Sequence, residues 1–589
     1  MNNQDIAKLL RNMAAAYEVK AENRFKIAAY ERAATEIEHA SSEIKDLWDD
    51  DNLDSLPGVG SRIAAYLDEL FRTGRVKHFQ AITKGLPEAM FVFLDIPGVG
   101  PKTAYKLCQN LGIKKKAKAV EKLKQAAKKG KIRKIEGFGE SSEKDILLGI
   151  AEFDKREERM SLPYAAELAK KIIDYLKKHP GVEKAYPLGS LRRCCPTIGD
   201  IDIAVKTQKP GIIIDYFVKY PETKKIVNQG KLKATIKLKN GRQIDLRAYQ
   251  KSFGAMLQYF TGSKHHNIHL REIAQKKGLS LSEYGIKIKG RLKEFEKEKN
   301  FYRFLGMEWI PPELREDTGE IKAAQSHQLP NLIKLSDIKG DFHTHSNFAY
   351  QESSHDSGKN SFEEIIKKAI ELDYEYIGLG EHSPSVGNHT KQQIITLLSK
   401  RKEAIEHLLK SKKFIQTNTR ENVREIKVFN TMEVDILADG SLAVPDEGLE
   451  KLDFAFVAVH SSMRQDRKTM TKRVLSALAH AKVKFLAHPT GRLLGKREGY
   501  ELNWGKIFDF CLKNNKWLEI NATPNRLDLS DTLVKKAIEA GVKLIIGSDA
   551  HEIEAMHFLK YGVSVARRGW VEKKNIINAL PRRKLEGII

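Results

Sequence analysis

Apolar residues recur at helical spacing through the first ~155 residues. In DIAKLLRNMAAAYEV (5–19) and FKIAAYERAATEIEHA (25–40), an apolar side chain returns every three to four positions, as on one buried face of a helix. One more helical stretch, YAAELAKKIIDYLKKH (164–179), then leads into short strand-like runs. From about residue 338 strand and helix patterns alternate. The pattern predicts a multidomain chain, helical first and α/β at the end.

A sequence repeat interrupts the helical region. LPGVGSRIAAYL (56–67) is echoed by IPGVGPKTAYKLC (96–108), with a looser copy, IEGFGESSEKDIL, at 135–147. Glycines let backbone N–H groups at the start of the following helix approach a phosphate without a side chain in the way. A single copy would also suit a plain helix connector, but two copies in register resemble the helix-hairpin-helix motif, which holds DNA backbones without reading sequence. The positions expected to contact DNA are Gly58, Gly60, Gly98 and Gly100.

The charge of the chain supports a polyanionic partner. The net charge is +25, and residues 114–134 hold eleven Lys or Arg and a single Glu. Basic residues spread evenly over the chain would indicate only a solvated surface, whereas clustered basic residues favour nucleic acid as a binding partner. A chain of 589 residues is too long for one hydrophobic core.

The sequence shows no sign of a membrane segment or of export. No apolar run approaches the ~20 residues that a membrane span needs, and MNNQDIAKLLRNM carries charges where a signal peptide would be apolar. The four cysteines lack CxxC spacing and are expected to be free thiols. We therefore expect a cytoplasmic protein.

Three aspartates are candidates for a metal site. Asp200 and Asp202 in GDIDIAV (199–205) are two residues apart on a β-rich run, so both carboxylates face one side of a sheet. Such a pair is unfavourable unless a cation lies between them. Asp245 in RQIDLRAY (242–249) lies on another apolar run that suits a neighbouring strand. Three converging carboxylates would hold two Mg²⁺ ions for phosphoryl transfer, whereas isolated aspartates on an exposed edge would not.

The C-terminal region predicts a second metal site. In GDFHTHS (340–346), Asp341, His343 and His345 alternate. Six later strand-like runs also end in ligand-type residues: Glu381 and His382, Glu433, His460, His488, Glu519 and Asn521, and Asp549 and His551. Functional residues at the carboxyl ends of buried parallel strands indicate a closed α/β barrel with its site at one rim. Imidazoles and carboxylates without thiolates suit Zn²⁺, Mn²⁺ or Fe²⁺ used for hydrolysis.

The middle of the chain resembles a known family. The motifs GS, RR, GDID, IDLR and YFTGSKHHNIHLRE resemble the nucleotidyltransferase core of family X DNA polymerases, most densely from about residue 50 to 290. The resemblance implies that Asp200, Asp202 and Asp245 are the catalytic metal ligands. It also implies contacts of Gly189, Ser190 and Arg193 with the triphosphate, of Tyr259, Phe260 and Gly262 with the sugar, and of Asn267 and Arg271 with base and template.

Two positions depart from this family pattern. Members with lyase activity carry a Schiff-base lysine one turn into the helix after the first PGVG, where this chain has Tyr66. Since a phenol forms no imine, we expect no 5′-deoxyribose phosphate lyase activity through that residue. The second departure is Cys194, Cys195 and Pro196, where relatives carry a polar turn.

The C-terminal motifs HTH, EH, MEVDI, VHSS, HPTGR and SDAH resemble the polymerase and histidinol phosphatase (PHP) domain over about residues 338–589. The resemblance implies a (β/α)7-type barrel. It also implies the metal ligands His343, His345, His382, Glu433, His460, His488, Asp549 and His551. A ninth ligand is expected in the lengthened segment after HTH, where Asp356 is the first candidate and His355 the second.

The order of the motifs along the whole chain is similar to that of bacterial family X DNA polymerases with a C-terminal PHP domain. The expected divisions are a helical helix-hairpin-helix domain (1–85), a second one (86–155), a nucleotidyltransferase palm of mixed β-sheet with helices (156–255), a nucleotide-selection subdomain (256–320), a linker (321–337) and the PHP domain (338–589). The resemblance implies gap filling in base excision repair with deoxynucleoside triphosphates, and 3′–5′ exonuclease or related 3′-end processing. Mg²⁺ or Mn²⁺ is expected at the polymerase site, up to three Mn²⁺ or Zn²⁺ ions at the PHP site, and a monomer.

The sequence leaves two alternative functions open. The chain could be a DNA-binding scaffold that recognises ends and polymerises weakly, although all three aspartates argue against this. The C-terminal domain could instead be a small-molecule phosphatase resembling histidinol phosphatase.

Overall fold

A computed structural model describes residues 3–39, 44, 48, 53, 59–154, 159–348, 356–411, 414–417, 423–497 and 499–589. The chain divides into two compact units. The first comprises Met1–Glu183, Gly199–Ile203 and Pro210–Ala248, and the second comprises Lys184–Ile198, Ala204–Lys209 and Tyr249–Ile589. Among the described residues, no helix is both long and apolar enough to cross a membrane.

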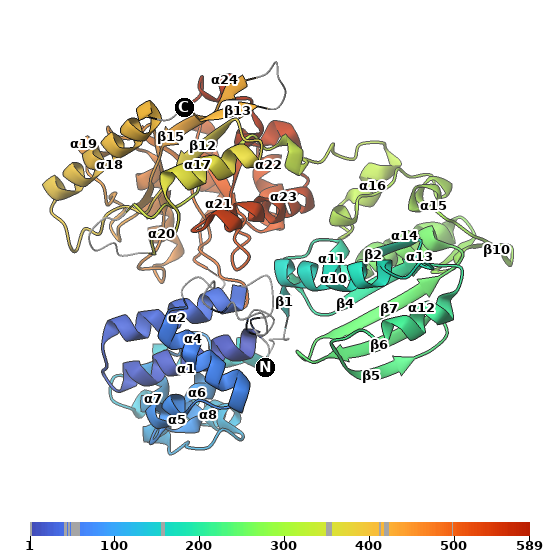
Figure 1. The fold of residues 1–589 in the computed structure, drawn as a ribbon, viewed down its shortest axis with the longest axis horizontal. Coiled ribbons are helices and arrows are strands. Elements are labelled where there is room, and N and C mark those ends of the chain that lie inside the picture. The colour runs from blue at the N-terminus through green and yellow to red at the C-terminus, as the bar shows by residue number, and fades with distance from the viewer. Residues whose placement is uncertain are drawn as a thin grey trace. The chain divides into compact units, whose positions relative to one another are not determined.

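The N-terminal part of the first unit is helical, as the apolar spacing predicts. Two hydrophobic clusters fill it, one built from residues between Ile6 and Phe79 and the other mainly from residues between Ala89 and Ile150. Gly74 and Gly112 end two of the helices in the left-handed conformation. The elements are α1 Asn3–Val19, α2 Arg24–His39, α4 Ser61–Thr73, α5 Lys77–Thr83, α6 Glu88–Phe93, α7 Pro101–Leu111, α8 Ala119–Lys128, η2 Ile132–Lys134 and α9 Glu140–Asp154 (Figure 1).

A β-sheet follows in the same unit, in which β4, β7, β6 and β5 lie side by side in that order. β6 and β7 pair antiparallel, with Thr235 opposite Asp245, and β5 pairs antiparallel with β6. Inward residues of β4 and β7, among them Ile203 and Leu246, are fully buried. The elements up to β7 are β1 Met160–Ser161, α10 Leu162–Lys177, β2 Lys184–Pro187, α11 Gly189–Arg192, β3 Thr197–Ile198, β4 Ile201–Lys206, α12 Pro210–Phe217, β5 Thr223–Gln229, β6 Lys233–Leu238 and β7 Gln243–Tyr249. Of these, β2, α11 and β3 belong to the second unit.

The second unit continues with helices around a small antiparallel sheet in the order β10-β9-β8. Its apolar cluster includes Phe301, Tyr302 and Ile310, and the half-buried Trp570 from near the C-terminus packs against it. The elements are α13 Phe253–Thr261, α14 Lys264–Lys276, β8 Leu279–Ser282, β9 Gly285–Ile288, β10 Arg291–Lys293, α15 Glu298–Phe304, η3 Pro312–Leu314, α16 Glu320–Gln325 and η4 Leu335–Asp337.

The rest of the second unit alternates strands and helices. The strands form two parallel sheets, β11-β12-β15 and β16-β17-β18-β19-β20. Single parallel bridges, His382 to Glu433 and Thr344 to Ala550, join the edges of the two sheets. The parallel strands predicted for the α/β barrel are therefore present, but in the described residues they form two sheets joined by single bridges and not one closed ladder.

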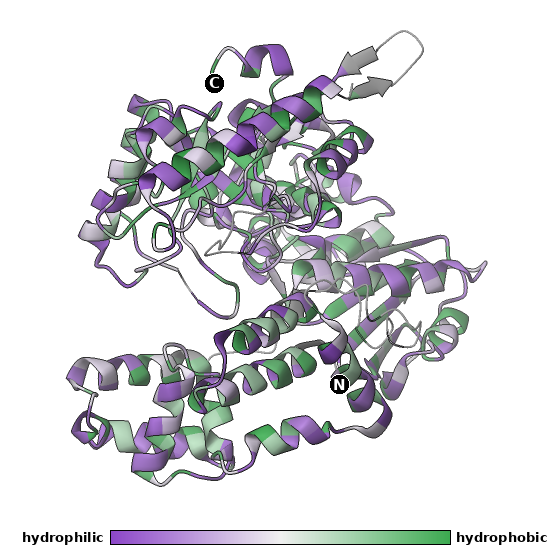
Figure 2. Ribbon diagram, turned by 60° about the vertical axis from the view of Figure 1, so that its left-hand side comes forward, coloured by the Kyte–Doolittle hydropathy of each residue, from purple (hydrophilic) through white to green (hydrophobic). Residues whose placement is uncertain are grey.

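Helices α17, α18, α20, α21, α22 and α23 surround these strands (Figure 1). Hydrophobic positions follow one side of the helices and hydrophilic positions the other, as expected for helices that cover a sheet (Figure 2). The elements are β11 Gly340–Asp341, α17 Phe362–Glu371, β12 Tyr376–Leu379, α18 Lys391–Ser411, β13 Ile415–Thr417, β14 Val423–Glu425, β15 Lys427–Asn430, β16 Glu433–Asp435, α19 Asp446–Leu449, β17 Ala455–Ala458, α20 Arg467–Leu478, β18 Val483–Leu486, α21 Trp504–Lys513, β19 Trp517–Asn521, α22 Asp531–Glu539, β20 Leu544–Gly547, η5 Ile553–Phe558, α23 Leu559–Arg568, η6 Lys573–Asn575, η7 Ile577–Ala579 and α24 Arg582–Leu585.

Aromatic side chains from several of the parallel strands pack together in one hydrophobic cluster. Phe456 and Phe485 stack with ring centroids 4.6 Å apart, and the cluster also contains Phe342, Tyr376 and Trp517. The ring of His343 lies 4.7 Å from that of Phe456, so the ligand-type residues sit directly on this aromatic layer. Dense packing of this kind holds side chains in single rotamers, which a preorganised site requires.

Candidate active sites

The three aspartates converge in the first unit. Asp245 on β7 is buried, and its carboxylate accepts hydrogen bonds from Thr235 Oγ1 and, at 3.0 Å, from Gln243 Nε2. Burial and the carboxylates of Asp200 and Asp245 together raise the pKa of Asp202 to about 6. The three acids lie in one locality because β4, which carries Asp202 and follows Asp200, is the neighbour of β7, which carries Asp245.

The aspartate cluster is open on one side. Asp200 is exposed and Asp202 is half-buried, whereas Asp245 is only 8% exposed. Lys233 and Arg247 lower the pKa of Asp202, which only partly offsets the effects of burial and of the other two acids. Among the described residues, the three aspartates are not one of the groups whose ligand atoms all lie within 4.8 Å of one another. Neighbouring carboxylates without enough positive charge nevertheless fit divalent cations, so these residues could hold the metal of a phosphoryl-transfer site.

The turn that carries Gly189, Ser190 and Arg193 lies in the second unit, where α11 is a four-residue helix. Arg193 donates to the carbonyl oxygen of Thr261 from Nη1 at 2.6 Å and to Glu316 from Nε at 2.9 Å. A Cβ at Gly262 would lie 3.1 Å from Arg193 Nη1, and the φ of Gly262 is +70°. Glycine is thus required at this position both for its conformation and for the close approach of the guanidinium.

The predicted sugar and base contacts surround the end of α13. The rings of Tyr259 and Phe260 meet edge to face with centroids 5.1 Å apart. Asn267 donates from Nδ2 to the carbonyl oxygen of Tyr259 at 2.7 Å and accepts from Gln258 Nε2 at 2.8 Å. Arg271 is exposed on α14 and donates to the carbonyl oxygen of Asn267 at 3.2 Å. The structure therefore brings these predicted residues together, and their roles remain predictions.

A buried ion cluster holds this region together and was missed at the sequence level. Arg192 makes a two-pronged contact with Glu298 at 2.9 and 2.6 Å, and Arg315 contacts the same carboxylate at 2.8 Å. Burial alone would raise the pKa of Glu298, yet the two guanidinium groups lower it to about 2. No local sequence pattern indicated this cluster, because Glu298 lies 106 residues from Arg192 in the chain.

Glu298→Gln is expected to lower the free energy of unfolding by about 3 kcal/mol at neutral pH, since breaking a buried ion pair leaves a charge uncompensated. The folded-state pKa of about 2 lies below the ordinary 4.5, so this contribution is complete above pH 4.5 and is lost as pH falls towards 2. Urea unfolding of both proteins between pH 7 and pH 3 measures it. Glu308→Gln is the control: Glu308 is half-exposed and pairs only with the exposed His327 among the described residues, so its substitution should change stability little. A stability difference between wild type and Glu298→Gln that stays constant across this range would contradict the assignment.

The glycines of the first repeat are described only in part, because Gly58 lies outside the described residues. Gly60 and Gly100 are the residues before α4 and α7, and both are exposed. A Cβ at Gly60, Gly98 or Gly100 would meet nothing within 4 Å. The backbone at these turns is therefore accessible, as contact with a phosphate chain needs.

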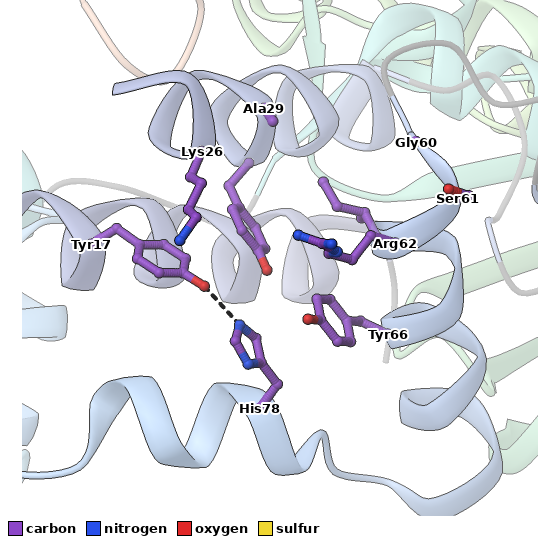
Figure 3. A pocket seen from close by; sticks show the side chains of 10 residues that line it. Tyr17, Lys26, Ala29, Gly60, Ser61, Arg62, Tyr66 and His78 are labelled. Atoms are coloured by element: carbon purple, nitrogen blue, oxygen red, sulfur yellow. Dashed lines mark hydrogen bonds between the residues drawn. The ribbon is translucent and has the colours of Figure 1, made fainter. Parts of the chain in front are cut away.

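A pocket of ≈ 300 Å³ lies beside the first repeat (Figure 3). Tyr17, Lys26, Arg62, Tyr66 and His78 line it, and Tyr17 hydrogen-bonds to His78 at 2.7 Å. Tyr66, the residue at the lysine position of lyase-active relatives, stacks on His78 with centroids 4.8 Å apart. The pocket combines two cations with aromatic walls, a chemistry that suits a phosphate attached to a sugar.

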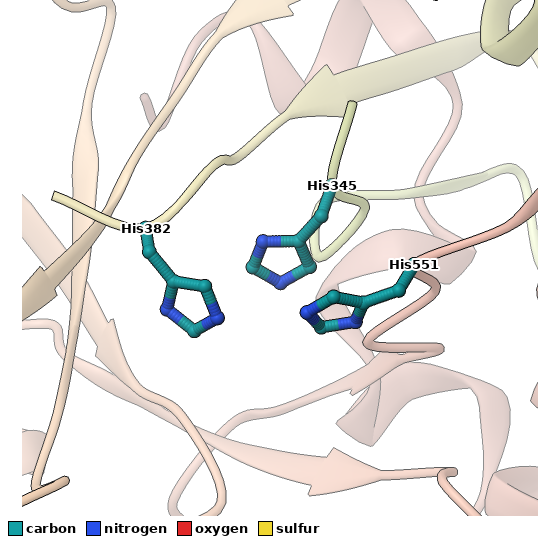
Figure 4. A group of neighbouring side chains, drawn as sticks. All are labelled: His345, His382 and His551. Atoms are coloured by element: carbon teal, nitrogen blue, oxygen red, sulfur yellow. The ribbon is translucent and has the colours of Figure 1, made fainter. Parts of the chain in front are cut away.

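The histidines and acids of the C-terminal region meet in one cluster. Three groups of side chains place their ligand atoms within 4.8 Å of one another: His345, His382 and His551; His343, His345 and Asp549; and His382, Glu433 and His460. The imidazoles of the first group come from three different segments and point towards one another (Figure 4). His488 Nε2 lies 2.7 Å from Glu433 Oε1, which adds the eighth predicted ligand. The structure thus assembles all eight.

Several of these ligand atoms are buried and have no hydrogen-bond partner in the part of the chain that the structure describes. They include His343 Nε2, both ring nitrogens of His345, Glu433 Oε2 and His488 Nδ1. Unpaired buried polar atoms are unfavourable, and converging imidazoles and carboxylates are the ligands that bind divalent transition metals. Glu433 would have a raised pKa from burial alone, yet His382 and His343 lower it well below its usual value. The residues present therefore fit a cluster of divalent metal ions.

Polar side chains beside the cluster, two acids and one amide, orient the ligands. Glu519 Oε1 lies 2.6 Å from His343 Nδ1, Asp435 Oδ1 lies 2.7 Å from His460 Nδ1, and Asn521 Nδ2 donates to Asp549 at 3.1 Å. Such contacts fix the ring orientation and tautomer of a ligating histidine. Asp435 was not predicted, although its two-residue spacing from Glu433 in MEVDI puts both on one strand face and could have revealed it.

Three candidate residues lie elsewhere. Glu381 accepts from Ser346 N at 3.0 Å and pairs with Arg401, so it supports the site without entering the ligand groups. Asp341 accepts from His343 N at 3.1 Å. Asp356 is exposed and is not a member of the three ligand groups, and His355 lies outside the described residues. The ninth ligand therefore stays a prediction.

Family models match three parts of the chain. A helix-hairpin-helix domain matches residues 1–76, a SAM-like helix-hairpin-helix tandem matches 92–152, and a DNA polymerase beta thumb matches 256–316. The first two confirm the prediction made from the PGVG repeat. The third covers most of the predicted nucleotide-selection subdomain.

Relatives extend the match to the whole chain. A Bacillus subtilis protein named DNA polymerase/3′-5′ exonuclease PolX is 33% identical over 596 residues, which cover 100% of this chain and 99% of the relative. DNA polymerase lambda of Rattus norvegicus is 24% identical over 53% of this chain and 56% of its own length. A probable phosphatase of Thermoanaerobacter sp. (strain X514) is 27% identical over 22% of this chain and 55% of its own length.

Proposed function

The chain belongs to the bacterial family X DNA polymerases with a C-terminal PHP domain, and we propose that it fills short gaps during base excision repair and trims 3′ ends before filling. Members of this family are DNA polymerases with 3′–5′ exonuclease activity, and this chain is such an enzyme. The observation that carries the proposal is the presence of two separate carboxylate-containing clusters, one of three aspartates and one of imidazoles with acids.

We assign nucleotidyl transfer to the aspartate cluster. Asp200, Asp202 and Asp245 would hold two Mg²⁺ or Mn²⁺ ions, which when bound lower the pKa of the primer 3′-hydroxyl and neutralise charge on the phosphates. Arg193 presents a guanidinium fork that suits the oxygens of the incoming triphosphate. The edge-to-face pair of Tyr259 and Phe260 would pack against the sugar and leave little room for a 2′-hydroxyl. These contacts favour deoxynucleoside triphosphates.

We assign 3′ resection to the cluster in the PHP domain. Its eight residues would hold up to three Mn²⁺ or Zn²⁺ ions, which supply a hydroxide nucleophile and polarise a phosphodiester. Glu519 and Asp435 keep His343 and His460 oriented for this purpose. The aromatic layer beneath the cluster excludes water from the side opposite to the substrate. The same chemistry suits 3′-phosphatase and abasic-site cleavage.

The N-terminal pocket supports gapped DNA as the substrate. A gap has a 3′ end to extend and a 5′ end that carries a phosphate, and Lys26 and Arg62 offer the charge to hold that phosphate. The two helix-hairpin-helix regions, proposed at 1–85 and 86–155, would hold the duplex backbone, helped by the cluster of basic residues at 114–134. We further propose that the protein acts as a cytoplasmic monomer, with a palm over 156–255 and a linker over 321–337.

Arg62→Gln is expected to weaken binding to a one-nucleotide gap with a 5′-phosphate by about tenfold, since a charge-assisted hydrogen bond to phosphate contributes about 1.5–3 kcal/mol. Affinity for the same gap with a 5′-hydroxyl should change much less. Fluorescence anisotropy and gap-filling rates on both substrates measure the difference. Arg75→Gln, an exposed arginine of the same region outside the pocket, is the matched control. Equal losses on the two substrates would argue against a 5′-phosphate in this pocket.

A further inference from the structure

An ion cluster links the PHP domain to the turn that carries Arg193. We propose that Arg568, at the end of α23, is a positioning residue for polymerisation: it neutralises Glu316, so that Arg193 can leave this carboxylate and bind the triphosphate. The inference rests on the role proposed above for Arg193. It assigns to the nuclease half of the chain a direct part in nucleotide binding.

Arg568 contacts the turn at several points. Its Nη1 donates to the carbonyl oxygen of Arg193 and to Glu316 Oε1, each at 2.9 Å, and lies 3.5 Å from Cys195 Sγ. Its Nη2 pairs with Asp531 at 2.6 Å. The side chain is only 8% exposed. A guanidinium held by these contacts is fixed in place and brings a permanent positive charge to the turn.

Glu316 is shared by two arginines. The same oxygen that accepts from Arg568 accepts from Arg193 Nε at 2.9 Å. Burial alone would raise the pKa of Glu316, yet the guanidinium groups of Arg193 and Arg568 lower it, so the carboxylate is ionised. If Arg193 turned to a triphosphate in the absence of Arg568, an unpaired carboxylate would remain beside the phosphates. Repulsion between like charges in a partly buried site would then weaken nucleotide binding.

Asp531 ties this cluster to the metal-binding region. It begins α22, directly after the segment that follows β19. Asn521, the last residue of β19, donates to the candidate ligand Asp549. In the segment that follows, Asp528 accepts from the backbone N–H of Thr490 and Gly491 at 3.0 Å, just after the candidate ligand His488 in the chain. One stretch of about ten residues thus supports the nuclease ligands at one end and Arg568 at the other.

The test compares nucleotide KM with kcat in the full-length protein. Arg568→Gln is expected to raise KM for the incoming nucleotide about tenfold, the effect of losing one charge-assisted contact, with kcat at saturating nucleotide and 3′ resection near wild type. Adding Glu316→Gln should return KM to near the wild-type value, because the carboxylate that Arg568 neutralises is gone. A residue that only maintained the fold would not be rescued by a second substitution. Arg568→Lys keeps the positive charge, so its nucleotide KM should lie between that of the wild type and that of Arg568→Gln.

Arg567→Gln is the matched control. Arg567 neighbours Arg568 on α23 and joins the same regions, through Glu313 at 2.7 Å and the carbonyl oxygen of Ile333 at 2.9 Å, without touching the turn. Its substitution should leave nucleotide KM unchanged. The inference is overturned if Arg568→Gln leaves KM unchanged, if Arg567→Gln raises it equally, or if Glu316→Gln does not rescue.

Two further variants separate the possible failures. Arg193→Gln should raise KM more than Arg568→Gln does. If it leaves KM unchanged, the proposed role of Arg193 is wrong; if it raises KM while Arg568→Gln does not, only the role of Arg568 is wrong. Glu316→Gln alone does not depend on the folding of an Arg568 variant, and it should keep KM at or below the wild-type value. A tenfold rise in the nucleotide KM of Glu316→Gln would also overturn the inference.

Discussion

Asp245→Ala is expected to lower the rate of primer extension by at least about a thousandfold, because each 1.4 kcal/mol of lost transition-state stabilisation reduces the rate about tenfold and metal ions contribute several kcal/mol. Asp245 is the buried member of the aspartate cluster and is held by Thr235 and Gln243. Its removal therefore takes away the best-oriented carboxylate. Extension of a primer in a gapped duplex with Mg²⁺ measures the loss, and resection of a 3′-recessed duplex should continue.

The control for this variant is Asp215→Ala. Asp215 is an acid of the same unit that accepts from Gln229 Nε2 at 2.8 Å on the exposed side of α12. The Asp215→Ala variant should extend primers at the wild-type rate. If Asp245→Ala still extends the primer, the aspartate cluster is not the polymerase site. If the wild type itself extends poorly with Mg²⁺ yet binds gapped DNA, an end-recognition scaffold would describe the protein better.

His345→Ala is expected to reduce 3′ resection by a similar factor and to lower the amount of bound metal. His345 belongs to two of the three ligand groups, is 1% exposed, and has two ring nitrogens without hydrogen-bond partners among the described residues. Its removal therefore takes one ligand from each of two groups. Resection of a 3′-recessed duplex and elemental analysis of the purified protein are the measurements. Primer extension should be unchanged.

His407→Ala, an exposed histidine on α18 of the same domain, is the control and should keep both metal and activity. Retained 3′ resection in His345→Ala would mean that another site removes nucleotides. A second experiment compares the rates at which the wild type hydrolyses free phosphomonoesters and DNA 3′ ends. Faster turnover of the small esters would favour a small-molecule phosphatase.

The fold was predictable where the sequence pattern repeats. Apolar spacing indicated the N-terminal helices, and two copies of PGVG indicated helix-hairpin-helix turns. Strand-like runs that end in histidine or acid indicated the parallel α/β domain. The break between β15 and β16 was not foreseen, because Glu433 follows β15 by only a few residues and the run KVFNTMEVDI looks like one continuous strand.

The candidate sites were predictable where ligands follow strands closely in sequence. The eight imidazole and carboxylate residues of the PHP domain follow such strands and do come together. Glu298 and Arg568 could not be found in this way, since their partners lie 106 and 252 residues away in sequence, at Arg192 and Glu316. A charged side chain far from any motif carries no local pattern that distinguishes a buried partner from a solvated one. Only the fold shows where such charges meet.

Trp570 joins the C-terminal domain to the helical cluster that precedes this domain in the same compact unit. Its half-buried ring packs into the apolar cluster of Phe301 and Tyr302, and Lys535 lies 4.1 Å above it. A shortened gene product that ended before the PHP domain would expose this apolar seam to water. Separating the two domains would therefore leave an exposed apolar surface unless polar residues replaced it, which favours keeping them on one chain.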